Sequence, residues 1–168
     1  MRIFFDITIF TAIGLAVLFV YLEFWDDIRL AVFNEEATYS LFVDTVPLDV
    51  TVADDPATRT KGLSGVSRLE PNQGKLFVFD DESKHGIWMK DMLIPLDIIW
   101  IDNELKIVYI EKQATPDSFP TVFAPTEPAR FVIEVNAFFV DSHNLEIGDT
   151  VFIPPEILPA DIIKDLQE

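Results

Sequence analysis

Apolar and polar positions along the chain predict a series of short strands. In the segment 46–52 every second residue is apolar, and Asp49 and Thr51 lie between the last three of these. This alternation is typical of a half-buried strand. The segment 96–101 is apolar throughout and predicts a strand buried on both faces. Further strands are predicted at residues 75–79, 86–90, 105–110, 130–135 and 150–153. The segments 75–79 and 86–90 are expected to form one hairpin, and 96–101 and 105–110 a second.

Helix signals are few and short. Asp54-Asp55-Pro56 predicts a helix start, because a capping carboxylate is followed by proline in the first turn. The helix covers residues 57–61, and Gly62 ends it. A helical turn is expected within residues 136–143, and a marginal surface helix at 161–166. The fold class is therefore α+β and mostly β: a compact barrel- or sandwich-like domain with one or two short helices.

Residues 111–128 interrupt this pattern. Pro116, Pro120, Pro125 and Pro128 argue against a regular element there. A long loop without regular structure often serves as a lid or binding loop, although it can also be simply mobile. We keep both interpretations.

The N-terminal segment predicts a single transmembrane helix before the domain. Residues 7–22 carry no formal charge, and about twenty residues span a hydrocarbon core. Residues 19–22, at the end of this segment, include no small residue for a cleavage site, so an uncleaved anchor is favoured over a cleaved signal peptide. Arg2 places the N-terminus inside and the domain outside the inner (cytoplasmic) membrane, in the periplasm or extracellular space. The predicted parts are an anchor at 1–23, a stalk or linker at 24–40, the β-rich body at 41–155 and a tail at 156–168.

Composition narrows the classes of partner. The formal net charge of −17 disfavours nucleic acid and anionic lipid, whereas cations, basic proteins and neutral small molecules stay open. The chain has no cysteine and only two histidines, His85 and His143. Disulfides, zinc–thiolate sites and His-rich metal sites are thus excluded. No cofactor and no metal site are predicted.

Charged residues inside the most apolar part of the body are the candidate site. Lys90, Asp91 and Asp97 lie within residues 86–102, and burying an unpaired charge costs several kcal/mol. Alternation puts Trp88 and Lys90 on one face of their strand. An indole beside an ammonium suits a planar or sugar-like polar ligand. The alternative is a core tryptophan with Lys90 extended to solvent or paired to a carboxylate.

Two further polar residues join the candidates. His85 precedes the 86–90 strand, where a role in turn formation or packing is the alternative to ligand contact. Glu134 interrupts an otherwise apolar strand and could either pair with Lys90 or contact a ligand. The candidate ligand-binding residues are therefore Trp88, Lys90, Asp91, Asp97, His85 and Glu134, with the 111–128 loop at the mouth.

The ordered landmarks of residues 50–151 resemble the DUF192 family, also called UPF0127. The most specific piece is Trp88-Met89-Lys90 followed by Ile94-Pro95-Leu96-Asp97, and Gly62-Leu63-Ser64-Gly65 and Pro128-Ala129-Arg130 complete the order. The resemblance implies a compact β-rich domain, often exported, with no established activity. Asp91-Met92 stand where the family usually has Asn-Thr, so a ligand contacted there would differ.

Three functions are consistent with these features. The first is an extracytoplasmic domain that binds a small polar or carbohydrate-like ligand. The second is a hydrolase or isomerase that uses Lys90 with a carboxylate as acid or base. The third is a structural or protein-interaction module at the membrane surface, which predicts an exposed apolar patch. The sequence names neither a reaction nor a protein partner.

Overall fold

The computed structural model describes residues 37–166, and they form a mostly-β domain. The large sheet contains β1 (Thr38–Val43), β2 (Val46–Ala53), β3 (Gln73–Ser83), β5 (Leu96–Ile101), β6 (Ile107–Ala114), β8 (Ala129–Asn136) and β9 (Val151–Phe152). A small second sheet contains β4 (Ile87–Trp88) and β7 (Val122–Phe123). The helices are α2 (Pro56–Lys61), α3 (Phe139–His143) and α4 (Ala160–Asp165), with 3₁₀ turns η1 (Pro116–Ser118) and η2 (Pro155–Ile157). The expected β-rich class is confirmed, with three short helices in the described part.

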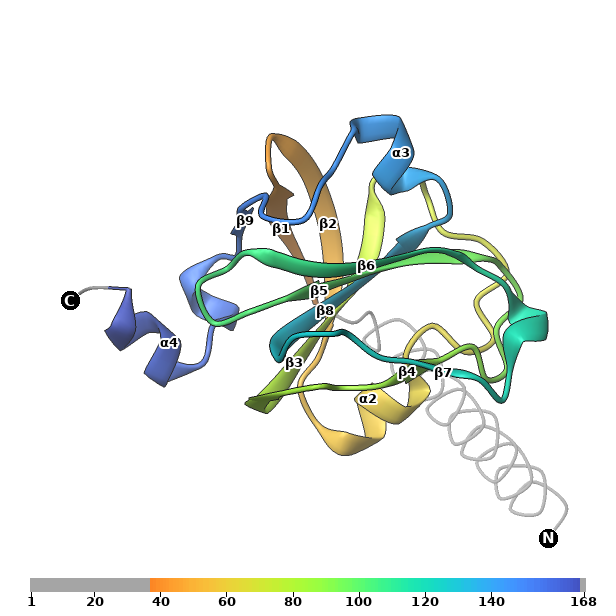
Figure 1. The fold of residues 1–168 in the computed structure, drawn as a ribbon, viewed down its shortest axis with the longest axis horizontal. Coiled ribbons are helices and arrows are strands. Elements are labelled where there is room, and N and C mark those ends of the chain that lie inside the picture. The colour runs from red at the N-terminus through yellow and green to blue at the C-terminus, as the bar shows by residue number, and fades with distance from the viewer. Residues whose placement is uncertain (1–36, 167–168) are drawn as a thin grey trace, which may run out of the picture. The chain divides into compact units, whose positions relative to one another are not determined.

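The large sheet curls into a half-barrel. Its strand order is β6-β5-β8-β3-β2-β1-β9, and its only parallel pair is β2 with β3, with α2 in the connection. A bridge between Lys106 and Thr150 brings the chain at the start of β6 against the chain before β9. Figure 1 shows α2 and the β4–β7 ribbon on one side of this sheet and α3 on the other. The curl therefore gives the sheet two differently covered faces.

Each face has its own apolar core. The concave core contains side chains from every strand of the large sheet, for example Leu41, Leu76 and Ile133. The second core lies under α2 and the β4–β7 ribbon, and includes Phe77 and Val132. All six residues of β5 are buried, so the prediction of a strand covered on both faces is confirmed.

Helix α2 begins and ends as its sequence predicts. The Asp55 carboxylate accepts from the amides of Ala57 and Thr58, and the Thr58 hydroxyl completes a capping box. The Thr58 hydroxyl, followed by these amides, lowers the pKa of Asp55. Gly62 ends the helix with φ of +50°, a conformation that a residue with a Cβ adopts only with strain.

The predicted hairpin between residues 75–79 and 86–90 is wrong. Strand β3 continues through the acidic residues to Ser83 and pairs with β2 and β8 on its two sides. The short β4 pairs instead with β7, where Ile87 faces Phe123. Residues 74–78 of β3 are all buried, so this strand needs partners on both edges, and β4 is too short to supply one. Long-range pairing thus overrides the local hairpin pattern.

Residues 111–128 are more ordered than the prolines indicated. The end of β6 reaches Ala114, η1 begins at Pro116, and β7 occupies Val122–Phe123. The four prolines lie between these elements or at the first position of η1, where no ladder hydrogen bond is lost. The segment remains a connection, but it contributes β7 to the second sheet.

The C-terminal tail packs on the body. Helix α4 buries Ile162, which is 2% exposed, and Arg130 of β8 pairs with Asp161 at 3.1 Å. Helix α4 is therefore anchored to the body by a buried side chain and an ion pair, and does not lie wholly on the surface as predicted. Strand β1 begins at Thr38, earlier than the expected start of the body at Leu41. The predicted anchor and most of the predicted stalk lie outside the described residues. Within residues 37–166 no helix is long and apolar enough to cross a membrane.

Candidate functional site

A cleft between α2 and β4 brings together the best-placed candidate residues. It consists of an inner pocket of about 50 Å³ and an adjoining outer hollow of about 310 Å³. We call the two together the α2–β4 cleft. Both parts are lined by Arg59, Thr60, Phe77, Gly86, Ile87 and Trp88. The inner pocket adds Lys61, Gly62, Leu63, Ser64, Met92 and Glu134.

Trp88 stands at the wall shared by the two pockets. Its indole is 44% exposed although its neighbours Ile87 and Met89 are buried, as the alternation predicted. The ring of Phe119 meets it edge-on with centroids 6.2 Å apart, and the Lys90 ammonium lies 5.9 Å from its centroid. An aromatic face of this size left in solvent offers a ready surface for stacking.

Glu134 lies deep in the same cleft. Its side chain comes from β8, is almost completely buried, and leaves Oε2 without a hydrogen-bond partner. Burial raises the pKa of this carboxyl to about 8, and the opposing charge of Lys75 on β3 lowers it by less. Ile133 and Val135, on either side of Glu134 in β8, face the concave core, so alternation along the strand puts Glu134 on the opposite face of the sheet.

Most other polar groups of the cleft are committed to the backbone. Arg59 Nη1 donates to the carbonyls of Asp54 and Val78 at 2.7 and 2.8 Å. The hydroxyls of Thr60 and Ser64 donate to backbone carbonyls at 2.7 and 2.9 Å. Of these contacts, the one from Arg59 to the Val78 carbonyl holds α2 against the sheet. The buried glutamate oxygen is therefore the polar atom of the cleft with capacity left for a ligand.

Lys90 and Asp91 form the turn beside Trp88, and both side chains are exposed. The backbone of this turn is fastened to the segment after α2: Gly65 donates to the Asp91 carbonyl at 2.9 Å, and Ser64 donates to that of Lys90. Asp91 has a φ of +56°, where Asn and Asp are the favoured residues besides glycine. Neither side chain lines the cleft, so the Asn-to-Asp difference from the family pattern concerns the turn backbone.

Asp97 and His85 lie outside the cleft. The Asp97 carboxyl is fully buried and accepts from the backbone amides of Gln113 and Val140 at 2.8 and 2.9 Å, which ties β5 to β6 and α3. His85 stacks on Phe79 at 3.7 Å between ring centroids. Its Nε2 lies 2.8 Å from the backbone carbonyl of Asp81. These contacts support the packing interpretation of both residues.

A larger hollow of about 410 Å³ lies between β2, β3 and the C-terminal segment. Its charged side chains include Asp54, Asp80, Arg130 and Glu156. Arg130 is engaged by Asp161, and Arg59 reaches Asp80 from the other side. This hollow is a weaker candidate because its one lining cation, Arg130, is already paired with Asp161 and its wall includes three carboxylates. No group of His, Asp and Glu able to hold a metal ion occurs within residues 37–166.

Sequence reasoning found Trp88 and Glu134 but missed the wall that α2 contributes. The sequence pattern predicts Gly62 only as a helix stop. A Cβ at Gly62 would lie 3.2 Å from Phe77 Cζ and 3.6 Å from Glu134 Oε2, so the glycine keeps space open above the buried carboxyl. The sequence shows Gly62 as a helix stop and Glu134 as a lone acid in an apolar strand. Their proximity could not be predicted, because the two residues are far apart in the sequence.

Two solved structures share this fold. A candidate transcription regulator from Sinorhizobium meliloti 1021 is 30% identical with a TM-score of 0.66, and the match covers 69% of this chain and 93% of that one. A protein of unknown function from Novosphingobium aromaticivorans DSM 12444 is 22% identical with a TM-score of 0.67, covering 72% of this chain and 89% of that one. Among curated proteins, none matches this chain.

The sequence matches one protein family over the whole curled sheet. The match covers residues 40–153, from β1 to the end of β9, and the family is described as DUF192, "Uncharacterized ACR, COG1430". Within the described residues, residues 37–39 and the C-terminal segment with η2 and α4 extend beyond it. Because this match spans more than half of the chain, the protein belongs to the DUF192 family.

Proposed function

We propose that the α2–β4 cleft binds a small, neutral, polar ligand of carbohydrate type. The observation that carries this proposal is an exposed indole above a buried carboxyl oxygen without a partner, at Trp88 and Glu134. The apolar face of a sugar ring stacks on an aromatic side chain, while its hydroxyls hydrogen-bond to polar groups deeper in the site. The outer hollow accommodates the ring and the inner pocket one substituent.

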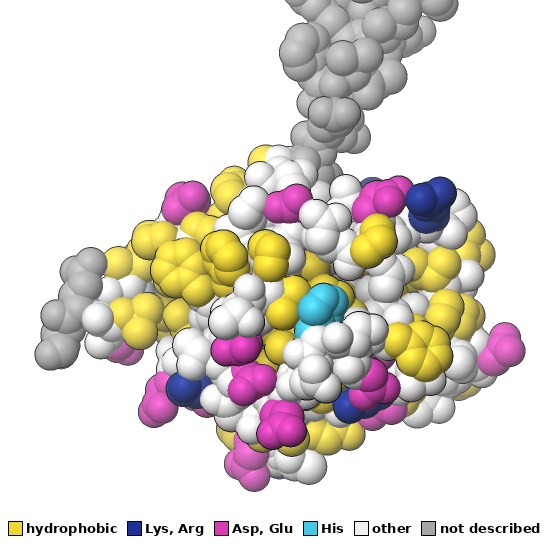
Figure 2. Space-filling view, turned by 90° about the horizontal axis from the view of Figure 1, so that it is seen from above, with side chains coloured by type: hydrophobic (Ala, Val, Ile, Leu, Met, Phe, Trp, Pro, Cys, Tyr) yellow, Lys and Arg dark blue, Asp and Glu magenta, His cyan; other side chains and the backbone are white. Residues whose placement is uncertain are grey.

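The charge of the protein supports a neutral ligand. The chain carries a formal net charge of −17, and Figure 2 shows acidic side chains spread among apolar ones over one face. This field repels anions approaching from solution. Anionic sugars and nucleotides are therefore less favoured than neutral ones.

The arrangement supports binding better than catalysis. Glu134 is the one carboxyl among the residues that line the cleft, whereas glycoside hydrolysis ordinarily uses two. Lys90 points its ammonium over the Trp88 ring, and the Asp97 carboxyl is engaged by backbone amides elsewhere. A hydrolase or isomerase built on Lys90 with a carboxylate thus has less support.

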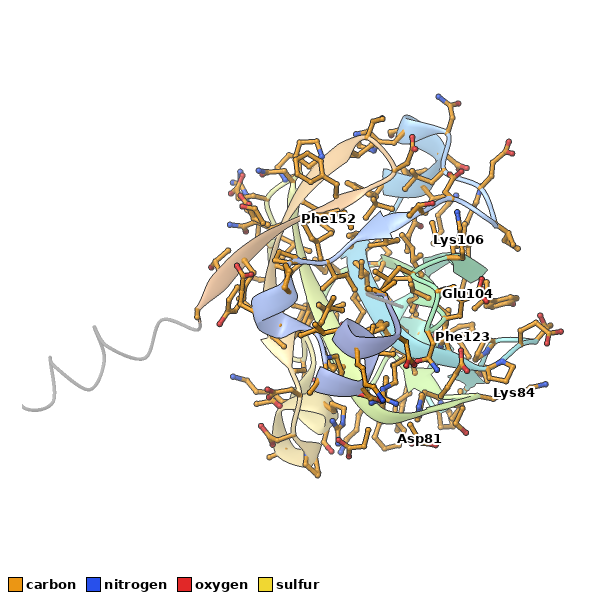
Figure 3. The ribbon with its side chains drawn as sticks, turned by 90° about the vertical axis from the view of Figure 1, so that its left-hand side faces the viewer. Asp81, Lys84, Glu104, Lys106, Phe123 and Phe152 are labelled. Carbon is orange, nitrogen blue, oxygen red and sulfur yellow. The ribbon has the colours of Figure 1, made fainter. Side chains whose placement is uncertain are left out.

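An interaction module remains the second candidate, on a different surface. Phe42 of β1 and Phe152 of β9 are paired in register at the edge of the sheet, and they are 43% and 56% exposed. Two adjacent exposed aromatics on an edge can serve protein contact. This surface offers a matched control for the cleft, because neither Phe42 nor Phe152 lines it. Figure 3 shows Phe152 well separated from Phe123 of β7, the strand that pairs with β4.

Replacing Trp88 with alanine is expected to weaken sugar binding about tenfold or more, because truncation of a central aromatic contact removes at least this much. Affinities of the full-length chain in detergent for glucose, galactose, maltose and N-acetylglucosamine, measured by isothermal titration calorimetry, provide the test. The control F152A removes an equally exposed aromatic and should bind as the wild type does. Equal binding by W88A, or binding lost only in F152A, would move the site away from the cleft.

We also propose that the domain lies outside the cytoplasmic membrane, held by the N-terminal apolar segment. Protease added to spheroplasts should then digest the domain while a cytoplasmic marker protein survives. A domain that is degraded only after the membrane is dissolved would place it inside the cell.

A further inference from the structure

Glu134 is the group of the cleft that the fold leaves least satisfied. It is 4% exposed, and Oε2 is one of three buried side-chain polar atoms without a hydrogen bond within the described residues. Native proteins pair nearly all such atoms, so an orphan in a pocket wall calls for a partner from outside. Gly62 lies close to this oxygen, since a Cβ built on it would lie 3.6 Å from Oε2.

The charged groups around Glu134 do not include a second acid. Lys75 faces it from β3 in register and donates to the Thr51 hydroxyl at 3.3 Å. Helix α2 contributes Arg59 and Lys61 to the cleft wall. On β5 the opposing residue is the apolar Ile98, and β4 contributes only apolar side chains. The carboxyl therefore faces one cation, Lys75, from β3, and apolar side chains from β5 and β4.

Burial outweighs the charge of Lys75 in setting the pKa of the Glu134 carboxyl. The desolvation of Glu134 raises the pKa of its carboxyl to about 8, despite the opposing effect of Lys75. At neutral pH most molecules then carry a proton on this side chain. A neutral carboxylic acid offers one donor and one acceptor side by side, whereas a carboxylate can only accept.

We propose that Glu134 engages its ligand as a neutral acid that donates its proton to a carbonyl oxygen on the sugar, so that the cleft selects a sugar with a carbonyl-bearing substituent such as an acetamido group. The carbonyl oxygen of an amide only accepts hydrogen bonds, so it can bind the protonated acid at Oε2 but not the carboxylate, whereas a hydroxyl can bind either form. The inner pocket of about 50 Å³ has room for a substituent of a few atoms, and the outer hollow for the ring beside Trp88. This inference rests on the proposed function and adds the substituent and the proton to it.

The test compares N-acetylglucosamine with glucose, which lacks the amide, by calorimetry on the full-length chain in detergent at pH 7 and pH 9. The wild type is expected to prefer N-acetylglucosamine and to bind it about tenfold more weakly at pH 9, as the proton is lost. E134Q carries a neutral side chain with donor and acceptor at every pH. It should bind N-acetylglucosamine with an affinity that does not change between the two values.

The outcomes separate the two proposals. Binding of N-acetylglucosamine that strengthens at pH 9, or that E134Q abolishes while keeping a wild-type circular dichroism spectrum, shows a carboxylate at work and overturns the neutral-acid inference alone. Equal affinity for glucose and N-acetylglucosamine also overturns it. If neither sugar binds the wild type at either pH, the proposed function falls and this inference falls with it. F152A serves again as the control for effects of pH on the rest of the domain.

Discussion

Replacing Asp97 with alanine is expected to destabilise the domain by about 2–6 kcal/mol, because two buried backbone amides lose their acceptor and each such loss costs about 1–3 kcal/mol. The carboxyl is fully buried and accepts from Gln113 and Val140. Its removal detaches the end of β6 and the first turn of α3 from β5. For a domain whose whole stability is about 5–15 kcal/mol, this is a large effect.

Chemical unfolding followed by tryptophan fluorescence measures the loss of stability in D97A. D97N keeps one acceptor oxygen and should lose less than D97A. D80A is the matched control, since the Asp80 carboxylate is 88% exposed and its contact with Arg59 is long, at 3.5 Å. This variant should stay within about 0.5 kcal/mol of the wild type. If D97A is as stable as D80A, the two amide contacts do not hold the sheet as described.

Replacing Glu134 with glutamine is expected to make the domain progressively more stable than the wild type as the pH rises from about 5 to 8. The folded state holds a proton on Glu134 up to a pKa of about 8, whereas the ordinary value is 4.5. Between these values the folded state binds more protons than the unfolded state, so wild-type stability falls with rising pH. A pKa difference of one corresponds to about 1.4 kcal/mol, so the whole difference is on the order of 5 kcal/mol.

Urea unfolding at pH 5, 7 and 9 provides the measurement, with the difference between E134Q and the wild type as the quantity of interest. Other titrating groups are common to both proteins and cancel in this difference. The exposed Glu127 supplies the control, because E127Q should show no such trend. A difference that stays constant from pH 5 to pH 9 would mean that Glu134 is ionised throughout, and the neutral-acid proposal would fail with it.

The local pattern of the chain determined most of its elements. Alternating and continuous apolar runs placed β2, β5 and β8, and the Asp55 cap with Gly62 placed α2. These features follow from interactions within a few residues, because side-chain alternation and capping are local properties of the backbone. The same alternation placed Trp88 on the face opposite Ile87 and Met89, and the structure buries these two neighbours and exposes Trp88.

Pairing and the roles of the charges required the tertiary structure. Whether β3 joined β4 or β8 depended on contacts between residues far apart in the sequence, and the stronger burial of the central strand decided it. Asp97 and Glu134 look alike in the sequence, as single acids within apolar strands.

Their different roles come from where neighbouring segments fold. The chain passing beside Asp97 presents two backbone amides, so this acid is satisfied internally. The chain passing above Glu134 presents Gly62, which has no side chain, so this acid is left with a pocket. The sequence by itself determined that buried acids exist, and only the tertiary structure decided which one is satisfied, because its partners are backbone groups that no sequence pattern marks.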